Sequence, residues 1–380
     1  MNRRLRATAR LGNRFTLISD GQGYFGRMLS AIDDSRDYVL AEFYLVESGA
    51  IMNKFIAAFA RASARGVRVR LVFDAFGARG LVGSDRARLR DSGVNLIFYN
   101  EPRWRSFSSI FLRDHRKVLI VDGVIGFTGG AGLADVFSPV ATPEAYWLDC
   151  MLEIAGPVLD DWHALFARTW RNCAHRPLDV AARRAMPVHP GETGRVVASA
   201  GLGRKELGRS VIKRVRAAKS RVWIATAYFW PSASLRRALR RAARRGVDVR
   251  LILTGPHTDA PIVRGVGRLF YARLITNHVV IHEYQQGFLH CKAILCDDWA
   301  SIGSSNLDRW GALWNLDANQ EIHSPIFAQQ LEATISRICK YSRVLRYPSD
   351  VEHSWTVYLW RLLARAVFAW SARAISRMRR

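Results

Sequence analysis

Two short strings of the sequence carry the residue types that acid–base and phosphate chemistry need. The first places His115 before Lys117 and Asp122, and a glycine pair, Gly129-Gly130, follows it. The same types recur with the same spacing at His290, Lys292 and Asp297, and this second copy is followed by Ser304, Ser305 and Asn306. A doubled string of this kind predicts two half-sites that face each other.

The histidine and the lysine of each string occupy alternate positions at the start of a strand, so their side chains point the same way. A lone histidine beside an apolar strand is usually a satisfied core residue, and a lone lysine usually lies on the surface. A lysine buried beside a histidine is unfavourable without an anion, and an oxyanion such as phosphate would satisfy both groups. Two copies therefore predict that two histidines and two lysines surround one phosphorus atom.

This set of groups supports a displacement at phosphorus in two steps. One neutral histidine attacks and forms a phospho-histidine, while the other, protonated, donates to the leaving oxygen. The lysines and the serine and asparagine donors hold the non-bridging oxygens and spread the developing charge. Because side chains supply the positive charge, we expect neither a metal ion nor a cofactor.

The segments around the first string alternate between strand and helix patterns. Strands are expected at 15–18, 38–45, 67–73, 94–99 and 118–121, and helices at 25–32, 51–65 and 85–92. Such alternation predicts an α/β layered domain with a largely parallel or mixed sheet.

The second half of the chain repeats this order of elements. The segment 221–229 parallels 36–44, the helix 235–245 and the strand 247–253 parallel 51–65 and 67–73, and 279–284 parallels 94–99. One long repeat with one copy of each element indicates a duplicated domain rather than a solenoid. We therefore expect a first domain at 1–171, a linker with prolines and charges at 172–194, a second domain at 195–345 and a C-terminal helix at 346–380.

Length and charge limit the classes of partner. The chain has 380 residues, 49% of them hydrophobic, which suffices for two domains with sizeable cores. Its 57 basic and 32 acidic residues give a formal charge of +25, which indicates polyanions as partners, either nucleic acid or an anionic membrane surface. The helix at 235–245 has an arginine-rich face that suits a solvated surface or a contact with anionic lipid.

The segment 355–380 has the pattern of a long amphipathic helix. Arg361, Arg365, Arg373 and Arg377 fall on one side, and Trp360 and Trp370 are among the apolar residues on the other. Arginine opposite tryptophan is typical of helices that lie in a membrane interface. The alternative is a helix that docks on the protein's own core or on a second subunit.

Cysteine content and hydropathy give further expectations. The five cysteines have no framework spacing, which indicates reduced thiols, and Cys291 and Cys296 lack the second pair that a metal site would need. The basic N-terminus has no apolar segment after it, so no secretory signal is predicted. No run of about 18 apolar residues occurs, so no spanning helix is predicted either. These patterns favour a soluble or peripheral protein.

With these motifs the chain resembles the phospholipase D superfamily, whose signature HxKxxxxD is present twice. Within it, the chain is more closely similar to bacterial cardiolipin synthases that lack N-terminal transmembrane helices. The resemblance runs from residue 12 to 343, and the blocks that carry it beyond the two motifs are 12–14, 65–74, 156–157, 228–231 and 283–292. It implies two pseudo-symmetric phospholipase D-like α/β sandwich domains with the active site at their interface.

The resemblance also implies an activity and residue roles. The activity is phosphatidyl transfer, which makes cardiolipin from phosphatidylglycerol and a second glycerophospholipid. His115 is implied as the nucleophile and His290 as the general acid. The other implied site residues are Lys117 and Lys292 on the phosphate, Asp122 and Asp297 completing the motifs, and Asp149 and Glu321 as carboxylates that orient the histidines.

The sequence departs from the family pattern at a few positions. Gly132 stands where the family usually has the asparagine of GGxN, which leaves backbone N–H groups of Gly129 and Gly130 as phosphate donors in the first half. The turn after the second motif is one residue shorter than usual, and Gln286 replaces a proline. These changes concern fine geometry and substrate choice.

Two other functions remain open from the sequence. Water could attack the same intermediate, which would make the protein a phospholipid hydrolase, or the charge could serve a nuclease or nucleic-acid binder of the same superfamily. The C-terminal amphipathic helix favours the lipid enzyme, because a nuclease does not need an anchor. Anionic phospholipids and a membrane surface are therefore the expected partners, at the cytoplasmic face of the inner membrane.

Overall fold

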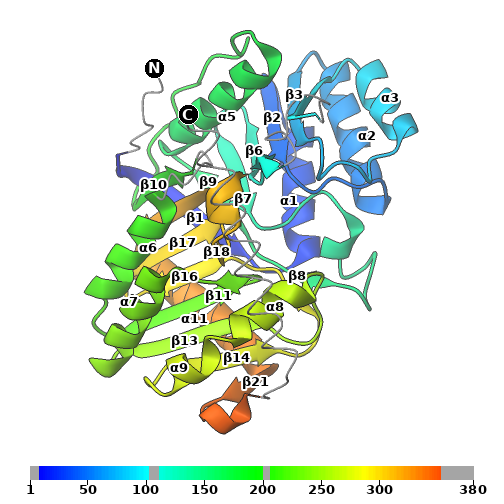
Figure 1. Cartoon of the computed structure of the whole chain (residues 1–380). Coiled ribbons are helices and arrows are strands. Elements are labelled where there is room, and N and C mark those ends of the chain that lie inside the picture. Colours follow the sequence, from blue (N-terminus) through cyan, green and yellow to red (C-terminus); the bar gives the residue numbers. More distant parts are fainter. Residues whose placement is uncertain (1–7, 102–110, 200–205, 352–380) are drawn as a thin grey trace, which may run out of the picture.

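The computed structural model of this chain describes residues 8–101, 111–199 and 206–351. They form two α/β halves that lie side by side and share one 15-stranded sheet (Figure 1). Among the described residues, no helix has both the length and the apolar character needed to cross a membrane. The predicted amphipathic helix at 355–380 lies outside the described residues.

The first half contains nine strands and four helices among its described residues. The strands are β1 (Arg10–Ile18), β2 (Tyr38–Phe43), β3 (Arg68–Asp74), β4 (Asn95–Tyr99), β5 (Arg113–Asp114), β6 (Lys117–Val121), β7 (Ile125–Gly129), β8 (Trp147–Leu148) and β9 (Met151–Ala155). The helices are α1 (Gly21–Asp33), α2 (Ala50–Ala64), α3 (Gly83–Asp91) and α5 (Leu159–Ala174), with a short 3₁₀ helix η1 (Asp135–Phe137).

The second half repeats this set with a few additions. Its strands are β10 (Glu192–Ala198), β11 (Arg221–Thr226), β12 (Phe229–Trp230), β13 (Asp248–Thr254), β14 (Val280–Tyr284), β15 (Phe288–Leu289), β16 (Ala293–Cys296), β17 (Trp299–Gly303), β18 (Leu307–Asp308), β19 (Asn315–Leu316), β20 (Ala318–His323) and β21 (Ser342–Leu345). Its helices are α6 (Glu206–Ala217), α7 (Ala233–Arg244), α8 (Pro261–Arg268), α9 (Tyr271–Ile275), α10 (Gly311–Trp314) and α11 (Pro325–Lys340), with a 3₁₀ helix η2 (Pro348–Asp350).

The strand order shows the duplication directly. From one edge to the other the sheet runs β21-β14-β13-β11-β16-β17-β20-β10-β1-β9-β7-β6-β2-β3-β4. The seven strands β4 to β1 on one side thus match the seven strands β14 to β10 on the other. The mixed sheet and the two-domain α/β architecture confirm the predicted fold class.

The registers correct one detail of the predicted repeat. β2 pairs with β6 so that Val39 lies opposite Val121, and β11 pairs with β16 so that Val222 lies opposite Cys296. Val222 therefore corresponds to Val39, and Arg221 corresponds to Tyr38 rather than to Arg36. The prediction that aligned 221–229 with 36–44 was wrong by two positions, because the two apolar runs alone leave the strand register open.

Helices cover both faces of the sheet, and α5 and α11 pack on the face opposite α1, α2, α6 and α7. α1 and α2 bury an apolar face on the first half, and α6 and α7 do the same on the second. A third cluster joins α5, α11 and strands of both halves into one core, which includes Trp162, Trp170, Ile302 and Phe327. Since both faces are covered, all six positions of β2 are buried, which explains its near-continuous apolar sequence.

The boundary between the halves lies close to the predicted linker. α5 continues to Ala174, and β10 begins at Glu192 and pairs with both β1 and β20. The segment outside helices and strands is thus 175–191, inside the predicted 172–194. His175 ends α5 in the left-handed conformation, which satisfies the last turn and redirects the chain. The division into domains remains a proposal.

Candidate active site

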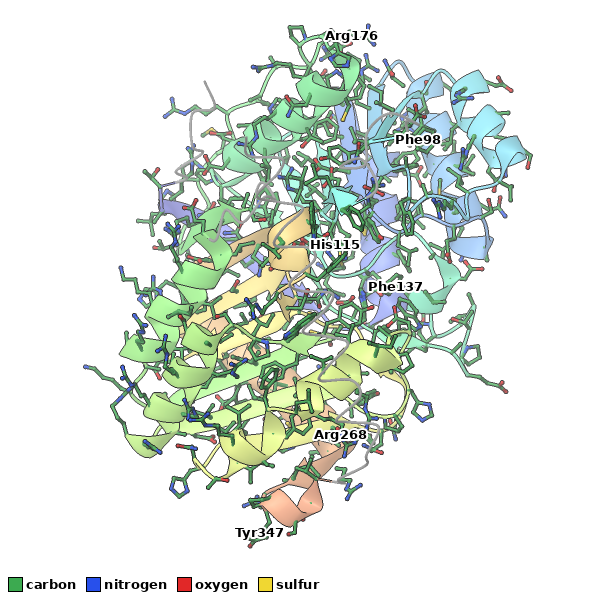
Figure 2. All side chains as sticks on the ribbon, viewed as in Figure 1. Phe98, His115, Phe137, Arg176, Arg268 and Tyr347 are labelled. Atoms are coloured by element: carbon green, nitrogen blue, oxygen red, sulfur yellow. The ribbon has the colours of Figure 1, made fainter. Side chains whose placement is uncertain are left out.

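Two small parallel ladders between the halves bring the motif strands together. β15 pairs with β8, so that Leu289 lies opposite Leu148, and β19 pairs with β5, so that Leu316 lies opposite Asp114. The backbone N–H of His290 donates to the Leu148 carbonyl at 2.8 Å, and that of His115 donates to the Leu316 carbonyl at 2.9 Å. Each histidine is thus held by backbone of the opposite half, and His115 lies centrally in the molecule (Figure 2).

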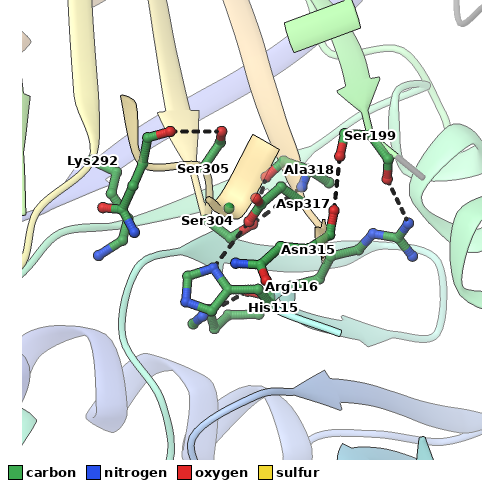
Figure 3. Close-up of polar contacts among 12 residues, drawn as sticks. His115, Arg116, Ser199, Lys292, Ser304, Ser305, Asn315, Asp317 and Ala318 are labelled. Atoms are coloured by element: carbon green, nitrogen blue, oxygen red, sulfur yellow. Dashed lines mark hydrogen bonds and ion pairs between the residues drawn. The ribbon is translucent and has the colours of Figure 1, made fainter. Parts of the chain in front are cut away.

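The same ladders give each histidine a carboxylate from the other half. Nδ1 of His290 lies 2.6 Å from Oδ2 of Asp149, and Nδ1 of His115 lies 3.0 Å from Oδ1 of Asp317 (Figure 3). A carboxylate at Nδ1 favours the tautomer with hydrogen on that nitrogen, which leaves Nε2 free to attack or accept a proton. All four side chains are buried. The two pairs therefore make one composite site.

Asp317 takes the role that the sequence assigned to Glu321. The Glu321 carboxylate accepts instead from Arg195, at 2.6 Å, and from the hydroxyl of Ser210. Glu321 lies four residues further along β20 than Asp317, which is about 13 Å at the rise of a strand. The prediction for Glu321 was therefore wrong, because that distance puts its carboxylate far from His115.

A signal for Asp317 was present in the sequence. Leu148-Asp149 and Leu316-Asp317 repeat the same dipeptide in the two halves, each just before a strand. Matching the dipeptides instead of the acidic residue of Asn319-Gln320-Glu321 would have identified the pair. What the sequence could not show is that each carboxylate serves the histidine of the opposite half.

Both motif lysines converge on the histidines. Nζ of Lys117 donates to the His115 carbonyl at 2.6 Å, and Nζ of Lys292 donates to the His290 carbonyl and lies 3.0 Å from Nδ1 of that ring. Both ammonium groups are buried, with exposed fractions of 1% and 2%. An anion placed between them would gain two charge-assisted hydrogen bonds.

The pKa values of these groups show their electrostatic coupling. Burial first, and then the charge of the neighbouring lysine, lowers the pKa of His115 to about 4 and that of His290 to about 3. Burial and the charge of Lys292 lower the pKa of Lys117 to about 7, and burial lowers that of Lys292. Each lysine also depresses the histidine of the opposite half, which places all four groups in one field.

The pKa values of the two carboxylates are also lowered, and for an acid this favours the charged form. Burial alone would raise the pKa of Asp149 and of Asp317. The charge of Lys292 and the His290 hydrogen bond lower the pKa of Asp149, and the bond to His115 lowers that of Asp317. Both acids are therefore ionised partners for an imidazolium.

Asp122 and Asp297 lie away from the histidines and support the backbone. Asp122 accepts the N–H groups of residues 36–38, at 2.8–2.9 Å, and Asp297 accepts those of residues 219–221, at 2.9–3.0 Å. Both residues have a positive φ, at 54° and 50°, in the turn that follows the motif strand. Five residues of strand, about 16 Å, separate each from its motif lysine. A catalytic role for them, which the sequence implied, is not supported by this geometry.

The first-half glycines make room for the histidine carboxylate. A Cβ on Gly130 would lie 2.4 Å from Oδ2 of Asp149, and the Gly130 N–H already faces the Cys150 carbonyl at 3.4 Å. Gly129 ends β7. These positions therefore support the site sterically, and binding of phosphate by their N–H groups has no support in the geometry.

The presence of glycine at position 132 also has a steric reason. The registers match Gly129 to Gly303, so Gly132 corresponds to Asn306 of the second half. A Cβ on Gly132 would lie 2.4 Å from the Leu45 carbonyl oxygen. An asparagine cannot occupy this position unless the backbone near Leu45 moves.

The second-half residues divide between orientation and substrate contact. Ser304 donates to Asp317 at 2.7 Å and accepts the Ala318 N–H at 3.1 Å, so its hydroxyl fixes the carboxylate that holds His115 (Figure 3). The Ser305 hydroxyl donates to the Asn306 carbonyl at 3.3 Å. Oδ1 of Asn306 is buried without a partner, so its amide is the member of this group best placed for a ligand.

Aromatic rings surround the two histidines unequally. The rings of Phe137, Trp147 and Phe288 lie 5.3–5.5 Å from that of His290. On the other side, Tyr44 contacts His115 edge-on at 4.9 Å. The His290 side of the site is therefore the more apolar one, a difference that the repeat pattern did not predict.

Two cysteines also meet beside the site, between the halves. Sγ of Cys150 and Sγ of Cys291 are 2.9 Å apart, and with Asp149 they form a group of possible metal ligands. Two thiolates on one tetrahedral ion with bonds of about 2.3 Å would be about 3.8 Å apart. Asp149 is also hydrogen-bonded to His290, so the arrangement suits a thiol contact better than an ion.

Comparisons with known proteins agree with this architecture. A family model described as "Cardiolipin synthase, PLD-like domain" matches residues 28–136 and 211–339, once in each half. Cardiolipin synthase A of Pseudomonas putida (strain W619) is 32% identical over 359 residues, which are 91% of this chain and 74% of that protein. Cardiolipin synthase B of Escherichia coli (strain K12) is 32% identical over 348 residues, which are 88% and 82% of the two chains.

Solved structures show the same fold at low sequence identity. The phosphatidylserine synthase of Haemophilus influenzae Rd KW20 is similar with a TM-score of 0.74 and 14% identity, over 95% of this chain and 94% of that one. A polyphosphate kinase from Porphyromonas gingivalis gives a TM-score of 0.58 and 14% identity, over 93% of this chain and 53% of the kinase. At this identity the likeness concerns the fold alone.

Proposed function

We propose, because the chain belongs to the family of cardiolipin synthases with phospholipase D-like domains, that it makes cardiolipin from phosphatidylglycerol and a second glycerophospholipid. As a member of this family it is a phosphatidyltransferase of cardiolipin synthase type. The observation that carries the proposal is the crossed pair of histidine–carboxylate contacts in one buried site. The donor, the acceptor and the order of steps are our inference.

The first step forms a bond between a histidine and phosphorus. Nε2 of His115 attacks the donor phosphorus while Asp317 holds Nδ1–H, and the bond from phosphorus to the glycerol oxygen breaks. His290 gives its proton to that oxygen, and glycerol leaves. Lys117 and Lys292 stabilise the charge that develops on the non-bridging oxygens.

The second step reverses these roles. His290, now neutral, accepts the proton of the acceptor lipid's hydroxyl, whose oxygen attacks phosphorus and releases His115. In the free protein both imidazoles are neutral at pH 7, given their lowered pKa values. A bound phosphodiester anion raises the pKa of an adjacent imidazole, which helps His290 hold the proton that it donates.

Several features favour a lipid substrate over water or nucleic acid. The relatives at 32% identity are named cardiolipin synthases. The three aromatic rings around His290 make an apolar wall that suits a lipid and disfavours entry of water. We place the protein at the cytoplasmic face of the inner membrane, peripherally, with the predicted C-terminal helix as an anchor.

Product analysis tests the proposal. The protein is incubated with phosphatidylglycerol, with and without phosphatidylethanolamine, and the lipids are identified by mass spectrometry. We expect cardiolipin and free glycerol, and His115→Ala and His290→Ala should each abolish both. Phosphatidic acid without cardiolipin would indicate hydrolysis instead, and cleavage of DNA with no lipid product would refute the proposal.

The histidine roles can be separated with an activated substrate. A phosphodiester whose leaving group is nitrophenolate needs no general acid, because that group leaves without a proton. We expect His290→Ala to release about one equivalent of nitrophenolate per protein in a burst, and His115→Ala to release none. The reverse result would make His290 the nucleophile.

A further inference from the structure

A dense positive charge outside the site lies on two neighbouring helices of the second half. α6 and α7 together carry nine arginine and lysine residues and one acid, Glu206. The helices pack side by side on the outer face of the sheet, where many nitrogen-tipped side chains project (Figures 1 and 2). This concentration of one sign exceeds what solubility alone requires.

The exposed cations form two parallel rows. Arg209, Lys213 and Arg216 follow one another at one-turn spacing on α6, and the α7 residues Arg237, Arg241 and Arg244 repeat this spacing. All six are exposed. Within the part of the chain that the structure describes, none of the six forms an ion pair.

A groove lies along α6, beside the start of α7. It has a volume of about 620 Å³ and is lined by the three cations of α6, by Ile212 and Ala217, and by Ser234 at the start of α7. Its wall thus combines positive charge, which attracts an anionic lipid headgroup, with apolar surface, which suits the hydrocarbon next to that headgroup. α7 follows β11, which ends at Thr226 beside the motif strand β16, so the chain enters α7 from the edge of the sheet at which Lys292 lies.

The cations also repel one another. Burial, followed by the charges of Arg273, Arg244 and Arg237, lowers the pKa of Arg240. An anionic surface over α7 would relieve this repulsion. Neither helix carries an aromatic residue on which nucleic-acid bases could stack, which favours a lipid over a single strand.

The duplication provides an internal comparison. α1 and α2 occupy in the first half the places of α6 and α7, but they carry three cations, two of which are paired with Glu153 and Asp33. Fold alone therefore does not explain the charge, because the same elements carry only three cations and one acid, Asp33, in the other copy. The asymmetry points to a function of the second half.

We propose that α6 and α7 form a membrane-docking surface, in which the two rows bind the phosphates of anionic phospholipids and the groove holds a headgroup. The surface is distinct from the catalytic phosphate site and rests on the proposed function for its choice of a lipid partner. It sets the second half against the bilayer and lets lipid reach the site from that side.

Charge substitution on the full chain tests this surface. In one variant Arg237→Gln, Arg241→Gln and Arg244→Gln remove three charges from α7. In the control, Arg36→Gln, Lys54→Gln and Arg90→Gln remove three exposed charges from the first half. Sedimentation with vesicles of phosphatidylcholine and about 30% phosphatidylserine measures binding to a lipid that is not the proposed donor.

We expect the α7 variant to bind these vesicles at least about tenfold more weakly, and the control to stay within about twofold of the unmodified chain. An equal loss of vesicle affinity in both variants would mean that only the net charge of the protein matters. No loss in the α7 variant would mean that α7 is merely a solvated surface. Either result overturns the proposal. Loss of affinity for duplex DNA, with unchanged vesicle binding, would overturn it in favour of nucleic acid.

Activity in detergent separates this proposal from the proposed function. With phosphatidylglycerol dispersed in micelles, both variants should make product at the unmodified rate, because neither touches the site. If the unmodified chain makes no cardiolipin there, the proposed function fails while the vesicle result still stands. If the α7 variant alone loses micellar activity, the surface is part of the catalytic unit, and docking is refuted.

Discussion

At the scale of single residues, the site depends on cations that are buried without being neutralised. Burial, followed by the charge of Lys292, lowers the pKa of Lys117, and burial lowers the pKa of Lys292. A phosphodiester reverses this effect because it supplies the opposite charge. Substrate binding is therefore linked to the protonation of a lysine near neutral pH.

This linkage predicts a pH profile. The pKa of Lys117 is about 7 in the free protein, so the fraction that carries the charge needed to hold phosphate falls as pH rises above 7. We expect kcat/KM to decline about tenfold for each pH unit well above that value. The rates are measured with micellar phosphatidylglycerol between pH 5 and about 9.

The control for this profile is Lys117→Arg. Its guanidinium stays charged over the whole range, so the decline assigned to Lys117 should vanish even if the absolute rate is lower. A decline of the same shape in Lys117→Arg would mean that another group causes it.

The carboxylate that orients His115 gives a second test. In Asp317→Asn the side chain keeps its size but presents an amide to Nδ1, which favours the wrong tautomer. We expect kcat to fall by about 10²–10⁴, as for other histidine–aspartate pairs, with a smaller change in KM. The steady-state rates are compared with those of Asp149→Asn.

Glu321→Gln serves as the matched control for this pair. Its carboxylate is equally buried but bonds Arg195 and Ser210, so the change should affect stability more than chemistry. If Glu321→Gln lost as much kcat as Asp317→Asn, with no change in stability, our assignment of Asp317 would be wrong.

At the scale of elements, the motif aspartates hold the strands that present the histidines. Asp297 joins the end of β16 to the start of β11 through three backbone N–H groups. Burial would raise its pKa, but these N–H groups and the Ser220 hydroxyl lower it to about 2. Since the folded-state pKa lies below the unfolded one, this stabilisation is present above about pH 4 and is lost as pH falls toward 2.

Removal of this carboxylate predicts a loss of stability. We expect Asp297→Ala to lower the free energy of unfolding by about 2–4 kcal/mol, from the lost hydrogen bonds and from an alanine at positive φ. Asp297→Asn, which tolerates that φ, should lose less. Urea unfolding gives the stabilities, and folded Asp297→Asn should keep its kcat within about twofold. A large loss of kcat in the folded variant would instead indicate a direct role in chemistry.

At the scale of the whole molecule, the halves meet through contacts that a linear comparison does not show. Cys150 comes from the first half and Cys291 from the second, and their sulfur atoms touch beside Asp149 and His290. The equivalent residues beside the other ladder between the halves, β5–β19, are Arg116 and Ala318. Arg116 forms a buried ion pair with Glu42 at 3.0 Å. The two contacts between the halves are therefore similar in backbone and different in side chains.

This contact predicts a cross-link between the halves. A two-electron thiol oxidant such as diamide should join Cys150 to Cys291 slowly, because both thiols are buried. A protease nick within 175–191 would then leave two fragments that stay together in a non-reducing gel and separate after reduction. Cys291→Ser is the control, and cross-linked fragments in that variant would show that other cysteines react.

Much of this protein follows from its sequence. The α/β class, the duplication and the strands and helices expected between residues 15 and 121 were predicted correctly, because apolar periodicity is a local property. The helices α5 and α11 and the strand β10 were not predicted, but the two lysine–histidine strings are visible in the sequence itself. Those strings also sufficed to indicate a phosphate site, since buried lysine next to histidine needs an anion.

Only the tertiary structure decided how the halves combine. Asp149 serves His290 and Asp317 serves His115 because the short ladders β8–β15 and β5–β19 cross between the halves, and such pairing leaves no periodic signal in either strand. The same folding showed that Glu321 bonds Arg195, and that Asp122 and Asp297 support backbone. Local pattern determined which residues could do chemistry, whereas contacts between residues far apart in sequence determined which of them meet.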